Sequence, residues 1–464
     1  MKKINLGQKD IIHFVGIGGI GMSGLAQIMR NMGFKIQGSD QNKNKNTVSC
    51  VRSGIKVFIG HSSKNVKKAN ILVKSSAIKN NNIEIRFAKK NKIPIYSRAE
   101  ILADVVSLKK NIIITGSHGK TTTTSLVAKI LSDQKLDPTI INGGVINSLK
   151  SNAKLGKGEW AILEADESDG SFLKLPINYS IVTNIDYEHL DYYKNYKNLE
   201  NSFLKFINKT PPTGKSIICL DSNNIRKIIK RIKNKNILTY GENKKADYQI
   251  KKIRYKFDCT IFNLNFKDKN KTRTIRNITV KLLGKHNVLN AAAAFVVCLN
   301  LGANLKIAIK SLKHFSGVQR RMTKIFTKNN NDFYDDYAHH PTEIKSILEG
   351  VHNVNNKRKI VTVFEPHRYS RVMSLKNEFS KCFSKSNLVI ICPLYAAGER
   401  KNLKFNMIKF ANLIAKNSNT KVIIVKNNLE LNSYFKKNLL SNEIIIGMGA
   451  GLISKWIGDL RYSL

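Results

Sequence analysis

Residues 111–124 read NIIITGSHGKTTTT, a β-branched run that leads directly into a loop with two glycines and then into a helical pattern. A strand, a glycine loop and a helix start, in this order, place backbone N–H groups and the positive end of a helix dipole around one point. Phosphate oxygens bind at such points. The stretch therefore predicts a phosphate-binding loop between a buried strand and a helix in an α/β domain.

The loop is shorter than the common phosphate-binding motif G-x-x-x-x-G-K-[ST], which needs a glycine where this chain has Ile114. Gly116 lies three residues before Gly119 instead and gives the form G-x-x-G-K-T. In this form Lys120 would reach the terminal phosphates, and the Thr121 hydroxyl would bind Mg²⁺. A glycine turn with an incidental lysine is the alternative. The residues expected at the phosphates of a bound nucleotide are Gly116, Ser117, His118, Gly119, Lys120, Thr121 and Thr122.

A second glycine loop, GIGGIG at residues 16–21, follows the apolar run IIHFV and opens a helical pattern. Asp40 ends the next strand, 19 residues after Gly21. This spacing is typical of dinucleotide-binding folds, in which the glycine turn faces a pyrophosphate and the acidic residue faces a ribose. The pattern fits NAD, FAD and a nucleotide sugar about equally well, and a turn that only serves packing is a further alternative.

Apolar strands alternate with helical patterns along the whole chain, which predicts α/β domains with mainly parallel sheets. The length of 464 residues corresponds to roughly three domains of about 150 residues. We place them at residues 1–106, with the first glycine loop, at residues 107–316, with the phosphate loop, and at residues 317–464. The third segment again contains strands that are each followed by a turn and a helix.

Acidic residues follow two strands of the predicted central domain. EADESD at residues 164–169 comes after the run AIL, and Asp186, Glu188 and His189 come after the run SIVTNI. The carboxyl ends of parallel strands are where nucleotide sites and their Mg²⁺ ligands lie. Acidic residues after strands also cap helices, so either role fits any single one of them. Several carboxylates and an imidazole near one loop favour a metal site, with His189 as a second kind of ligand.

A helix start at GKHNVLNA brings His286, Asn287 and Asn290 within about one turn. Two of these side chains can therefore share a face of the helix, where a planar amide can pair with an adenine edge. Capping of the helix by Asn287 is the alternative, because asparagine is a preferred N-cap residue. The segment indicates a nucleotide contact without establishing one.

Two segments of the third domain crowd ionisable side chains at predicted strand ends. They are YDDYAHHP at residues 334–341 and EPHRYSR at residues 365–371. Arg368 and Arg371 are three residues apart, so one helical face can present both to a carboxylate or a phosphate. Two solvated surface arginines are the plainer interpretation.

The chain carries 79 basic and 32 acidic side chains, a formal charge of +47. Such a charge can indicate a nucleic-acid or membrane-surface partner. The lysines are instead scattered among isoleucine and asparagine along the whole chain, without an aromatic stripe or a single basic arm. We interpret the charge as a compositional bias and expect no specific nucleic-acid partner.

Six cysteines lie far apart and form no C-x-x-C pair, which indicates neither a zinc site nor a disulfide framework and favours the reducing cytoplasm. The apolar stretch at residues 11–29 superficially resembles a secretory signal, but its five glycines favour a strand, a turn and a helix start. No apolar run of 18 residues occurs elsewhere, so we expect no membrane span.

Taken in order along the chain, these motifs resemble those of the Mur ligase family over essentially the whole length. Ser117 stands where threonine is common in the family, and Ala338 where glycine is usual. EADESD resembles the form of the members that add L-alanine, whereas members that add a whole peptide carry EADEYD. The strings that carry the resemblance are HFVGIGGIGMSG, GSHGKTTTT, EADESDGSF, NIDYEHLDYY, GKHNVLNA, GVQRR, DDYAHHPTE and EPHRYSR.

The resemblance implies the type and the ligand of each domain. The N-terminal domain would be Rossmann-like and bind a UDP-sugar, the central domain would be a P-loop ATPase, and the C-terminal domain would be Rossmann-like and bind an amino acid. The residues that it places near the UDP-sugar are Gly18, Gly19, Gly21, Ser23, Asp40, His61 and Ser76.

It also implies roles around ATP. Thr121 and Glu167 would hold one Mg²⁺ and His189 the second. His286 and Asn290 would meet the adenine. The nucleotide side would also include Arg321, and the alanine and acyl end would be lined by Tyr337, His339, Arg368 and Arg371. The residues expected to take part in catalysis are Lys120, His189, His339, Arg368 and Arg371.

The implied reaction is the ATP-dependent ligation of L-alanine to the lactyl carboxylate of UDP-N-acetylmuramate, in peptidoglycan precursor synthesis. A carboxylate is a poor electrophile, so it would first take the γ-phosphoryl group of ATP, and the alanine amine would then attack the acyl phosphate. The expected partners are these three substrates, with Mg²⁺ as cofactor and the chain as a monomer or homodimer. Other ligases of the family use a carbamylated lysine at the metal centre, and Lys205 is near that place but offset.

Two functions of other classes compete with this one. A nicotinamide-dependent oxidoreductase would explain the first glycine loop but would leave GSHGKT without a role. A basic nucleic-acid-binding ATPase would explain the phosphate loop and the charge. Neither explains both glycine loops, so the ligase is the favoured hypothesis.

Overall fold

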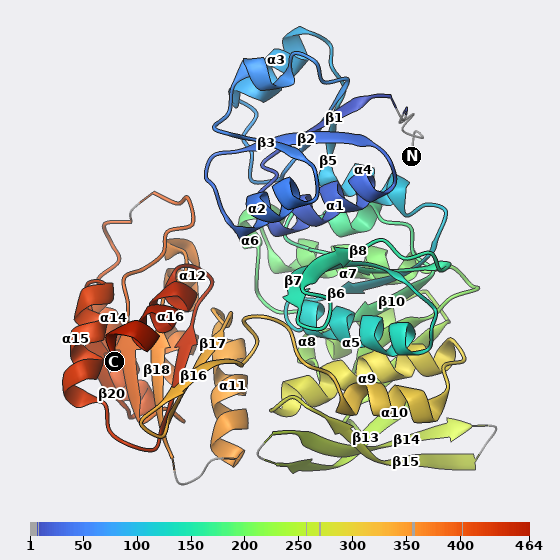
Figure 1. The fold of residues 1–464 in the computed structure, drawn as a ribbon. Coiled ribbons are helices and arrows are strands. Elements are labelled where there is room, and N and C mark those ends of the chain that lie inside the picture. Colours follow the sequence, from blue (N-terminus) through green and yellow to red (C-terminus); the bar gives the residue numbers. More distant parts are fainter. Residues whose placement is uncertain (1–6, 8, 257, 269–270, 355–357, 401) are drawn as a thin grey trace. The chain divides into compact units, whose positions relative to one another are not determined.

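A computed structural model describes residues 7–464 except residues 8, 257, 269–270, 355–357 and 401. This part of the chain contains three mainly parallel sheets with helices packed on them (Figure 1). The predicted α/β fold class is therefore confirmed. The chain divides into two compact units, of which the first comprises Met1–Lys252, Phe262–Val280 and Leu289–Ser316, and the second Ile253–Ile261, Lys281–Val288 and Gly317–Leu464. None of the described helices is long and apolar enough to cross a membrane.

The first sheet has five strands in the order β3-β2-β1-β4-β5, and all its pairs are parallel. After β1 the chain continues to β2 on one side of it and later returns to β4 on its other side. The strand order therefore reverses between β1 and β4, and sheets of this type bind ligands at the carboxyl ends of the two strands that flank such a reversal. The strands are β1 (Ile11–Val15), β2 (Lys35–Asp40), β3 (Lys56–Ile59), β4 (Ile71–Lys74) and β5 (Ile95–Ser97), and the helices are α1 (Ile20–Asn31), α2 (Lys45–Arg52), α3 (Ile83–Lys90) and α4 (Arg98–Val105).

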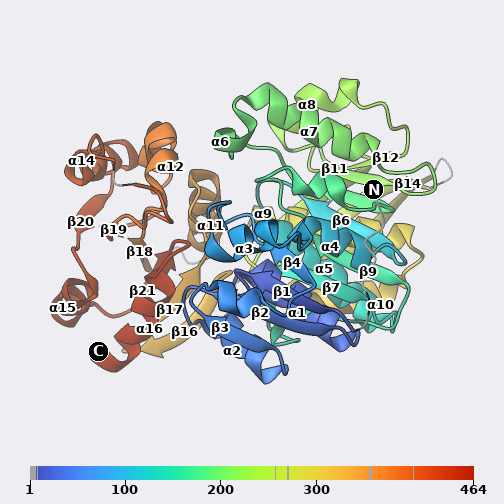
Figure 2. The ribbon, with the colours of Figure 1, turned by 90° about the horizontal axis from the view of Figure 1, so that it is seen from above.

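The second sheet has ten strands in the order β15-β14-β13-β12-β11-β10-β6-β9-β7-β8. Helices cover both faces, with α7 and α8 on one side and α5 and α10 on the other (Figure 2). The strands are β6 (Lys110–Thr115), β7 (Thr139–Ile146), β8 (Ser151–Lys154), β9 (Trp160–Glu164), β10 (Tyr179–Val182), β11 (Ser216–Cys219), β12 (Ile237–Gly241), β13 (Tyr248–Tyr255), β14 (Thr260–Asp268) and β15 (Lys271–Val280). The helices are α5 (Lys120–Asp133), α6 (Leu190–Tyr193), α7 (Tyr196–Asn208), α8 (Asn223–Ile228), α9 (Lys285–Asn300) and α10 (Leu305–Lys313).

Strand β6 forms because its β-branched run is buried on both faces. Ile112, Ile113 and Ile114 are each 0 % exposed, as expected for a central strand between two helical layers. Strand β6 pairs in parallel with β10 on one side and β9 on the other. The residues that follow these three strands therefore lie at one edge of the sheet, where the predicted phosphate loop begins.

Helix α1 of the first sheet packs on the hairpin formed by β7 and β8 of the second. The amide of Asn152 donates to the Ile20 carbonyl at 2.8 Å and lies 3.5 Å from the Asn142 carbonyl oxygen. The amide of Asn142 in turn donates to the Ser125 hydroxyl at 2.9 Å, and that hydroxyl donates to the Thr121 carbonyl at 2.7 Å. A chain of hydrogen bonds thus connects the first turn of α1 with the first turn of α5.

The second unit contains a six-stranded sheet in the order β16-β17-β21-β18-β19-β20, in which only the edge pair β16 and β17 is antiparallel. Apolar clusters around Phe364 on one side and Phe333 on the other bury both faces. The strands are β16 (Thr323–Lys328), β17 (Asn331–Asp336), β18 (Lys359–Phe364), β19 (Leu388–Ile391), β20 (Lys421–Ile424) and β21 (Glu443–Met448). The helices are α11 (Pro341–Val354), α12 (Tyr369–Ser374), α13 (Lys376–Lys381), α14 (Met407–Ser418), α15 (Asn428–Asn438) and α16 (Ile453–Ser463).

Asp332 of β17 generates a pH-dependent stability of the second unit. Its carboxylate accepts hydrogen bonds from Arg358 at 2.6 Å and Thr327 at 2.8 Å and pairs with Lys324 at 2.5 Å. Burial would raise the pKa of Asp332, but the hydrogen bonds from Lys324 and Arg358 outweigh burial and lower the pKa from 3.8 to about 2. The charged Asp332 carboxylate and its three partners therefore stabilise the fold above pH 4. This contribution to stability is lost as the pH falls through 2, where the carboxylate becomes protonated.

We predict that Asp332→Asn lowers the stability by about 2 kcal/mol at pH 5, and that this difference disappears near pH 2. Thermal unfolding followed by circular dichroism between pH 5 and pH 2 measures it. Glu378→Gln on the exposed face of α13 is the matched control and should behave like the unchanged protein at every pH. A difference between Asp332→Asn and the unchanged protein that does not shrink with acidification would contradict the assigned charge.

Candidate active site

The predicted phosphate loop is present between β6 and α5. Gly116 has φ +132° and Gly119 has φ +82°, conformations that side chains rarely adopt. A Cβ atom at Gly116 would lie 2.2 Å from the Thr183 hydroxyl, so this position has no room for one. Both glycines of the short motif are therefore required by the path of the backbone, and Gly119 directly precedes the first turn of α5.

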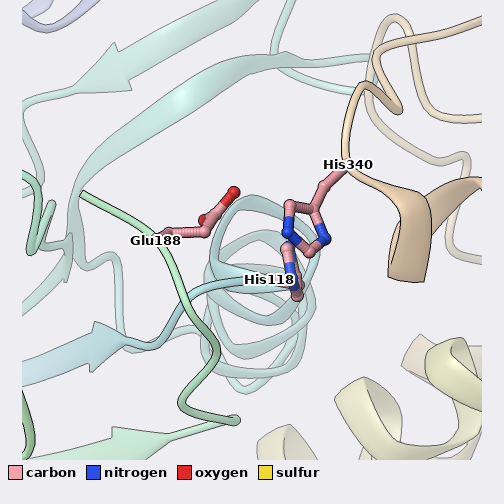
Figure 3. A group of neighbouring side chains, drawn as sticks. All are labelled: His118, Glu188 and His340. Atoms are coloured by element: carbon pink, nitrogen blue, oxygen red, sulfur yellow. The ribbon is translucent and has the colours of Figure 1, made fainter. Parts of the chain in front are cut away.

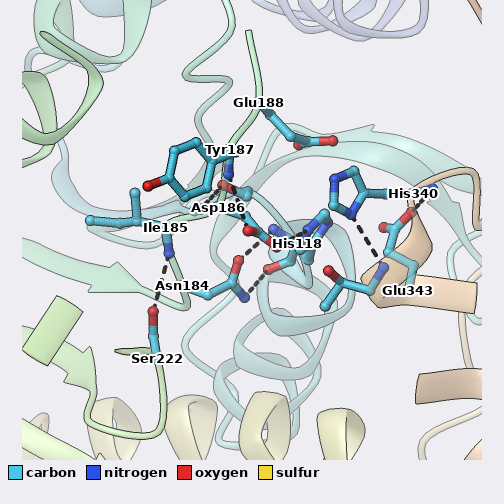
Figure 4. Close-up of polar contacts among 12 residues, drawn as sticks. His118, Asn184, Ile185, Asp186, Tyr187, Glu188, Ser222, His340 and Glu343 are labelled. Carbon is cyan, nitrogen blue, oxygen red and sulfur yellow. Dashed lines mark hydrogen bonds and ion pairs between the residues drawn. The ribbon is translucent and has the colours of Figure 1, made fainter. Parts of the chain in front are cut away.

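Residues after β10 hold the loop in place (Figure 4). The Asn184 side chain accepts from the His118 backbone N–H at 2.8 Å and donates to the His118 carbonyl at 3.0 Å. The Ser117 hydroxyl accepts from the Asp186 backbone N–H at 2.8 Å, and the His118 ring lies 3.3 Å from the Asp186 carboxylate. Ser117 thus supplies the loop-stabilising hydroxyl at the position where the family commonly has threonine.

Lys120 and Glu167 form the central ion pair of the site. The Lys120 Nζ atom lies 2.8 Å and 3.1 Å from the two Glu167 oxygens and also donates to the Gly116 carbonyl at 2.6 Å. The Glu167 side chain is 1 % exposed. Burial opposes both charges, but their attraction dominates, so the pKa of Lys120 is raised and the pKa of Glu167 is lowered. Both groups are therefore charged at neutral pH.

Asp166, Glu167 and His189 form a cluster that can hold a metal ion, because one ligand atom from each lies within 4.8 Å of the others. The His189 Nε2 atom is 3.5 Å from Glu167, and this contact raises the pKa of His189 although burial works against its charge. The Tyr193 hydroxyl donates to the Glu167 carbonyl and fixes the chain at this point. The structure thus brings Glu167 and His189 together, as the sequence predicts. It adds Asp166, which the sequence indicates only as a member of the segment EADESD.

The Thr121 hydroxyl donates to the Glu164 carboxylate at 3.0 Å. The other Glu164 oxygen accepts from the Gly143 backbone N–H at 2.6 Å. Sequence reasoning gave Glu164 no role of its own, and its position as the last residue of β9, next to β6, is the signal that would have found it. A second carboxylate therefore lies beside the first turn of α5.

His118 and Glu188 lie on neighbouring loops of the first unit (Figure 3). His118 belongs to the phosphate loop, and Glu188 follows β10, 3.8 Å from the His189 ring. Glu188 is 9 % exposed, and one of its carboxylate oxygens lies within 4.8 Å of a ring nitrogen of His118 in the phosphate loop. His340, labelled in the same figure, belongs to the second unit and is 3 % exposed.

The first glycine loop is organised around Asp40. The Asp40 carboxylate accepts from the Gly18 backbone N–H at 2.8 Å. A Cβ atom at Gly21 would lie 2.8 Å from the Arg98 guanidinium, so this cation lies against the start of α1. Sequence reasoning missed Arg98, which has no motif around it. The Ser23 hydroxyl is buried and donates to the Ile20 carbonyl at 3.0 Å, whereas Ser76 is exposed after β4.

The predicted adenine contacts lie in the first turns of α9. Asn290 is 5 % exposed and accepts from the Thr123 hydroxyl at 3.2 Å. A Cβ atom at Gly119 would lie 2.4 Å from its amide oxygen, so Asn290 packs directly against the phosphate loop. His286 belongs to the second unit. A contact of either residue with adenine stays a prediction.

Cationic and aromatic side chains gather at the carboxyl edge of the third sheet. The guanidinium carbons of Arg320 and Arg321 lie 4.9 Å and 5.5 Å from the centre of the Tyr337 ring. His339 lies 2.9 Å from the Tyr337 carbonyl oxygen, and its ring centre is 5.5 Å from that of His367. The sequence predicts Tyr337 and His339 at the alanine end and Arg321 on the nucleotide side, and it does not predict Arg320 or His367. The structure brings Arg321 next to Tyr337, and its contact with the nucleotide stays a prediction.

His367 is partly buried and lies beside the predicted arginines. Burial, His339, Arg371 and Arg368 together lower the pKa of His367 from 6.5 to about 3. The Arg371 guanidinium lies 3.2 Å from the His367 ring nitrogen Nδ1. Arg368 directly precedes α12 with φ +67°. The imidazole is therefore neutral, and the positive potential here suits a carboxylate or a phosphate.

Two sequence observations find a structural explanation. Ala338 is buried, donates its N–H to Asp336 at 2.7 Å and does not have a positive φ, so the turn needs no glycine there. Lys205 is exposed on α7 and lines a surface pocket with Asn208 and Arg231. It is therefore not one of the groups around Glu167.

Three family models match consecutive parts of the chain. They are described as the Mur ligase family catalytic domain at residues 11–110, the Mur ligase middle domain at residues 114–298 and the Mur ligase glutamate ligase domain at residues 320–451. The three matches follow the order of the three sheets. The domain limits predicted from the sequence stay predictions.

The chain is also similar to named proteins over its full length. It is 52% identical over 460 residues to a UDP-N-acetylmuramate–L-alanine ligase of Pelagibacter ubique, covering 99% of both chains. It is 42% identical to the protein of that name from Brucella anthropi, covering 85% of this chain and 84% of the relative. The crystal structure of UDP-N-acetylmuramate-alanine ligase from Thermotoga maritima superposes with a TM-score of 0.83 at 28% identity, covering 98% of this chain and 99% of the other.

Proposed function

The chain belongs to the Mur ligase family, and on that premise we propose that it joins L-alanine to the lactyl carboxylate of UDP-N-acetylmuramate while ATP becomes ADP and phosphate. The product serves peptidoglycan precursor synthesis. The observation that carries the proposal is the identity of 52% across 99% of both chains to a relative of that name, together with the phosphate loop and its charged cluster. The reaction belongs in the cytoplasm, where six free cysteines stay reduced.

Lys120 is the residue that meets the terminal phosphates of ATP. Its ammonium is charged and lies at the mouth of the loop, held by Glu167 and the Gly116 carbonyl. Backbone N–H groups of the loop and the start of α5 would bind the remaining phosphate oxygens. These groups act by positioning and by offsetting negative charge on the transferring phosphoryl, so no side-chain nucleophile is needed.

The charged cluster fits a Mg²⁺ ion. Asp166 and Glu167 provide the carboxylate oxygens that this ion prefers, and His189 completes a set of ligand atoms within 4.8 Å of one another. When bound, Mg²⁺ supplies positive charge to the β and γ phosphates. Thr121 would join the site through a lone pair of its hydroxyl oxygen while it still donates its hydrogen to Glu164.

The sugar and the amino acid would bind at the other two sheets. The glycine loop with Gly18, Gly19 and Gly21, the nearby Asp40 and the Arg98 guanidinium suit the UDP-sugar. In the second unit, the positive potential around His367 suits the carboxylate of alanine. The residues proposed to bind it are Tyr337, His339, Arg368 and Arg371.

The order of bond changes follows from the chemistry of a carboxylate. A lactyl carboxylate oxygen attacks the γ-phosphorus of ATP, and the bond to the β-phosphate oxygen breaks to release ADP. The alanine amine then attacks the acyl carbon, the acyl–oxygen bond breaks, and phosphate leaves with one former carboxylate oxygen. The alanine ammonium must lose one proton before the attack, because the attacking nitrogen needs a free lone pair, and a second proton leaves as the amide forms.

We expect steady ADP release only when UDP-N-acetylmuramate, L-alanine and ATP are all present, and we expect EDTA to abolish it and Mg²⁺ to restore it. A coupled ADP assay with each substrate omitted in turn measures this. The same assay with added DNA or RNA, and a test for oxidation of NADH or NADPH, separates the two competing functions. Unchanged ADP release without alanine, or stimulation by nucleic acid, would argue against the ligase.

We predict that Lys120→Ala lowers kcat by about 10²-fold or more, because a charge aimed at the transferring phosphoryl is removed. Affinity for UDP-N-acetylmuramate, measured by calorimetry, should stay nearly unchanged, because its proposed site lies on a different sheet. Lys129→Ala, on the same helix and paired only with Asp133 across one turn, is the matched control. Loss of sugar binding in Lys120→Ala would show that the two sites are wrongly assigned.

Oxygen labelling tests the acyl phosphate directly. UDP-N-acetylmuramate labelled with ¹⁸O in its carboxylate should transfer one label to the released phosphate in every full turnover. Mass spectrometry of the phosphate measures this. Direct attack of the amine on an unactivated carboxylate would leave the phosphate unlabelled and would remove the acyl phosphate from the mechanism.

A further inference from the structure

The N-terminal sheet contains a buried polar network in which His61 is the one member that the family resemblance places near the UDP-sugar. It consists of His13, Gln37, Ser39, His61, Asn65 and Glu84, and we call it the Glu84 network. His13, Ser39 and Glu84 are each 0 % exposed. Burying a carboxylate costs several kcal/mol unless other groups compensate its charge, so its surroundings must satisfy it closely.

Five donors surround the Glu84 carboxylate. Its Oε2 atom accepts from the Ser39 hydroxyl at 2.5 Å and lies 3.3 Å from the rings of both His13 and His61. Its Oε1 atom accepts from the Ser62 backbone N–H at 3.1 Å and the Asn65 amide at 2.8 Å. Burial alone would raise the pKa of Glu84, but these hydrogen bonds lower it from 4.5 to about 2.

Gln37 determines where the hydrogen on His13 lies. The Gln37 nitrogen donates to the Asn65 carbonyl at 2.8 Å, which fixes the orientation of its amide. The same nitrogen lies 3.2 Å from the His13 Nδ1 atom, which must therefore accept its second hydrogen. The His13 Nε2 atom then carries a hydrogen and donates it to Glu84. Both ring nitrogens of His13 thus have a hydrogen-bond partner.

Ser39 determines where the hydrogen on His61 lies. The Ser39 hydroxyl gives its only hydrogen to Glu84, so toward His61 it can only accept. The His61 Nδ1 atom lies 3.0 Å from the Ser39 oxygen and 3.3 Å from the Glu84 oxygen, and both are acceptors. Nδ1 therefore carries the hydrogen. In a neutral ring, Nε2 is then left as an acceptor, and the side chain is 15 % exposed.

The place of His61 in the fold identifies what this acceptor faces. His61 follows β3, and Asp40 ends the neighbouring strand β2. The Ser39 carbonyl accepts from the Gly16 and Ile17 backbone N–H groups, so the network also supports the first glycine loop. In sheets of this type, the loop after the first strand binds the pyrophosphate and the end of the second strand meets the nucleoside. His61 lies one strand farther on the nucleoside side.

We infer that Glu84 is a positioning residue for the nucleoside half of the UDP-sugar, holding His61 with its hydrogen on Nδ1 so that Nε2 accepts a hydrogen bond from the ligand. The inference rests on the proposed function. The uracil ring offers one such donor, the imide N–H at position 3, and the ribose offers its two hydroxyls. Cytosine has an unprotonated nitrogen at position 3, so an acceptor on the protein disfavours it.

Glu84→Gln tests the inference because it exchanges an acceptor oxygen for a donor NH₂. With the amide oxygen directed at Ser62 and Asn65, its NH₂ faces Ser39 and the two rings. The His61 Nδ1 atom then faces a donor where the Glu84 acceptor was, which favours the tautomer that accepts at Nδ1 and carries its hydrogen on Nε2. The enzyme would present a donor to the ligand where it previously presented an acceptor.

Calorimetry of the full chain with UDP, CDP, 2′-deoxy-UDP and 3′-deoxy-UDP measures the effect. If Nε2 accepts from the uracil imide, Glu84→Gln lowers the preference for UDP over CDP by about tenfold or more. If Nε2 accepts from the ribose, the preference for UDP over one deoxy analogue falls by a similar factor instead. Preferences that are all unchanged would overturn the inference.

His61→Ala and the double variant distinguish positioning from general stabilisation. His61→Ala should lower the same preference, and adding Glu84→Gln to it should have no further effect, since Glu84 acts through His61. Additive losses would overturn the inference. ¹⁵N spectra of labelled histidine should show His61 protonated at Nδ1 in the unchanged chain and at Nε2 in Glu84→Gln, and protonation at Nε2 in the unchanged chain would also overturn it.

Glu100→Gln is the matched control, because Glu100 is a hydrogen-bonded carboxylate of the same domain that caps α4 and lies outside the Glu84 network. It should leave every ligand preference unchanged. Absence of UDP binding by the unchanged chain would contradict the proposed function itself. Binding of UDP with preferences insensitive to Glu84 would contradict only the present inference.

Discussion

The ion pair of Lys120 and Glu167 is the interaction on which the rest of the phosphate site depends. Glu167 is almost fully buried, and an isolated carboxylate there would cost several kcal/mol. The Lys120 ammonium compensates this charge and at the same time binds the carbonyl oxygens of its own loop. Phosphates that enter the loop would compete for the same ammonium. Binding of an anionic substrate would therefore make a carboxylate available to a cation, which would couple the two binding events electrostatically.

Parallel strands bring these groups together from distant parts of the sequence. β9, β6 and β10 are neighbours, and the segments after them provide Glu167, Lys120 and His189. The third sheet repeats the arrangement, because the segments after β17 and β18 provide His339 and His367. Each of these two sheets thus concentrates charge at one edge, while its buried faces are mainly apolar. Because the charged groups lie at the edge and the apolar residues on the faces, the core can consist of ordinary aliphatic residues without affecting the groups at the site.

The sequence predicts the fold well, because strand, loop and helix follow one another within short segments such as NIIITGSHGKTTTT. Both glycine loops and the strand ends at EADESD and EPHRYSR are local signals of this kind. The roles of Glu164, Arg98 and Arg320 are not local, because each depends on which strand or helix lies beside it. His367 stands inside a recognised motif, yet its neutral state comes from partial burial and from neighbouring His339 and arginines that no spacing reveals. Glu84 has no motif around it, and its role follows only from the hydrogens of its neighbours.

The hydrogen bonds through Asn152 and Asn142 have a consequence for the entropy of the reaction. They join the first turn of the helix proposed to face the sugar pyrophosphate to the first turn of the helix that follows the phosphate loop. Gly24 allows this close packing, since a Cβ atom there would lie 2.8 Å from the Asn152 amide. If ATP and the UDP-sugar bind where proposed, both would lie on the first compact unit. Their encounter would then behave as an intramolecular event with a high effective molarity, and the translational freedom of two substrates would be lost at binding instead of at the chemical step.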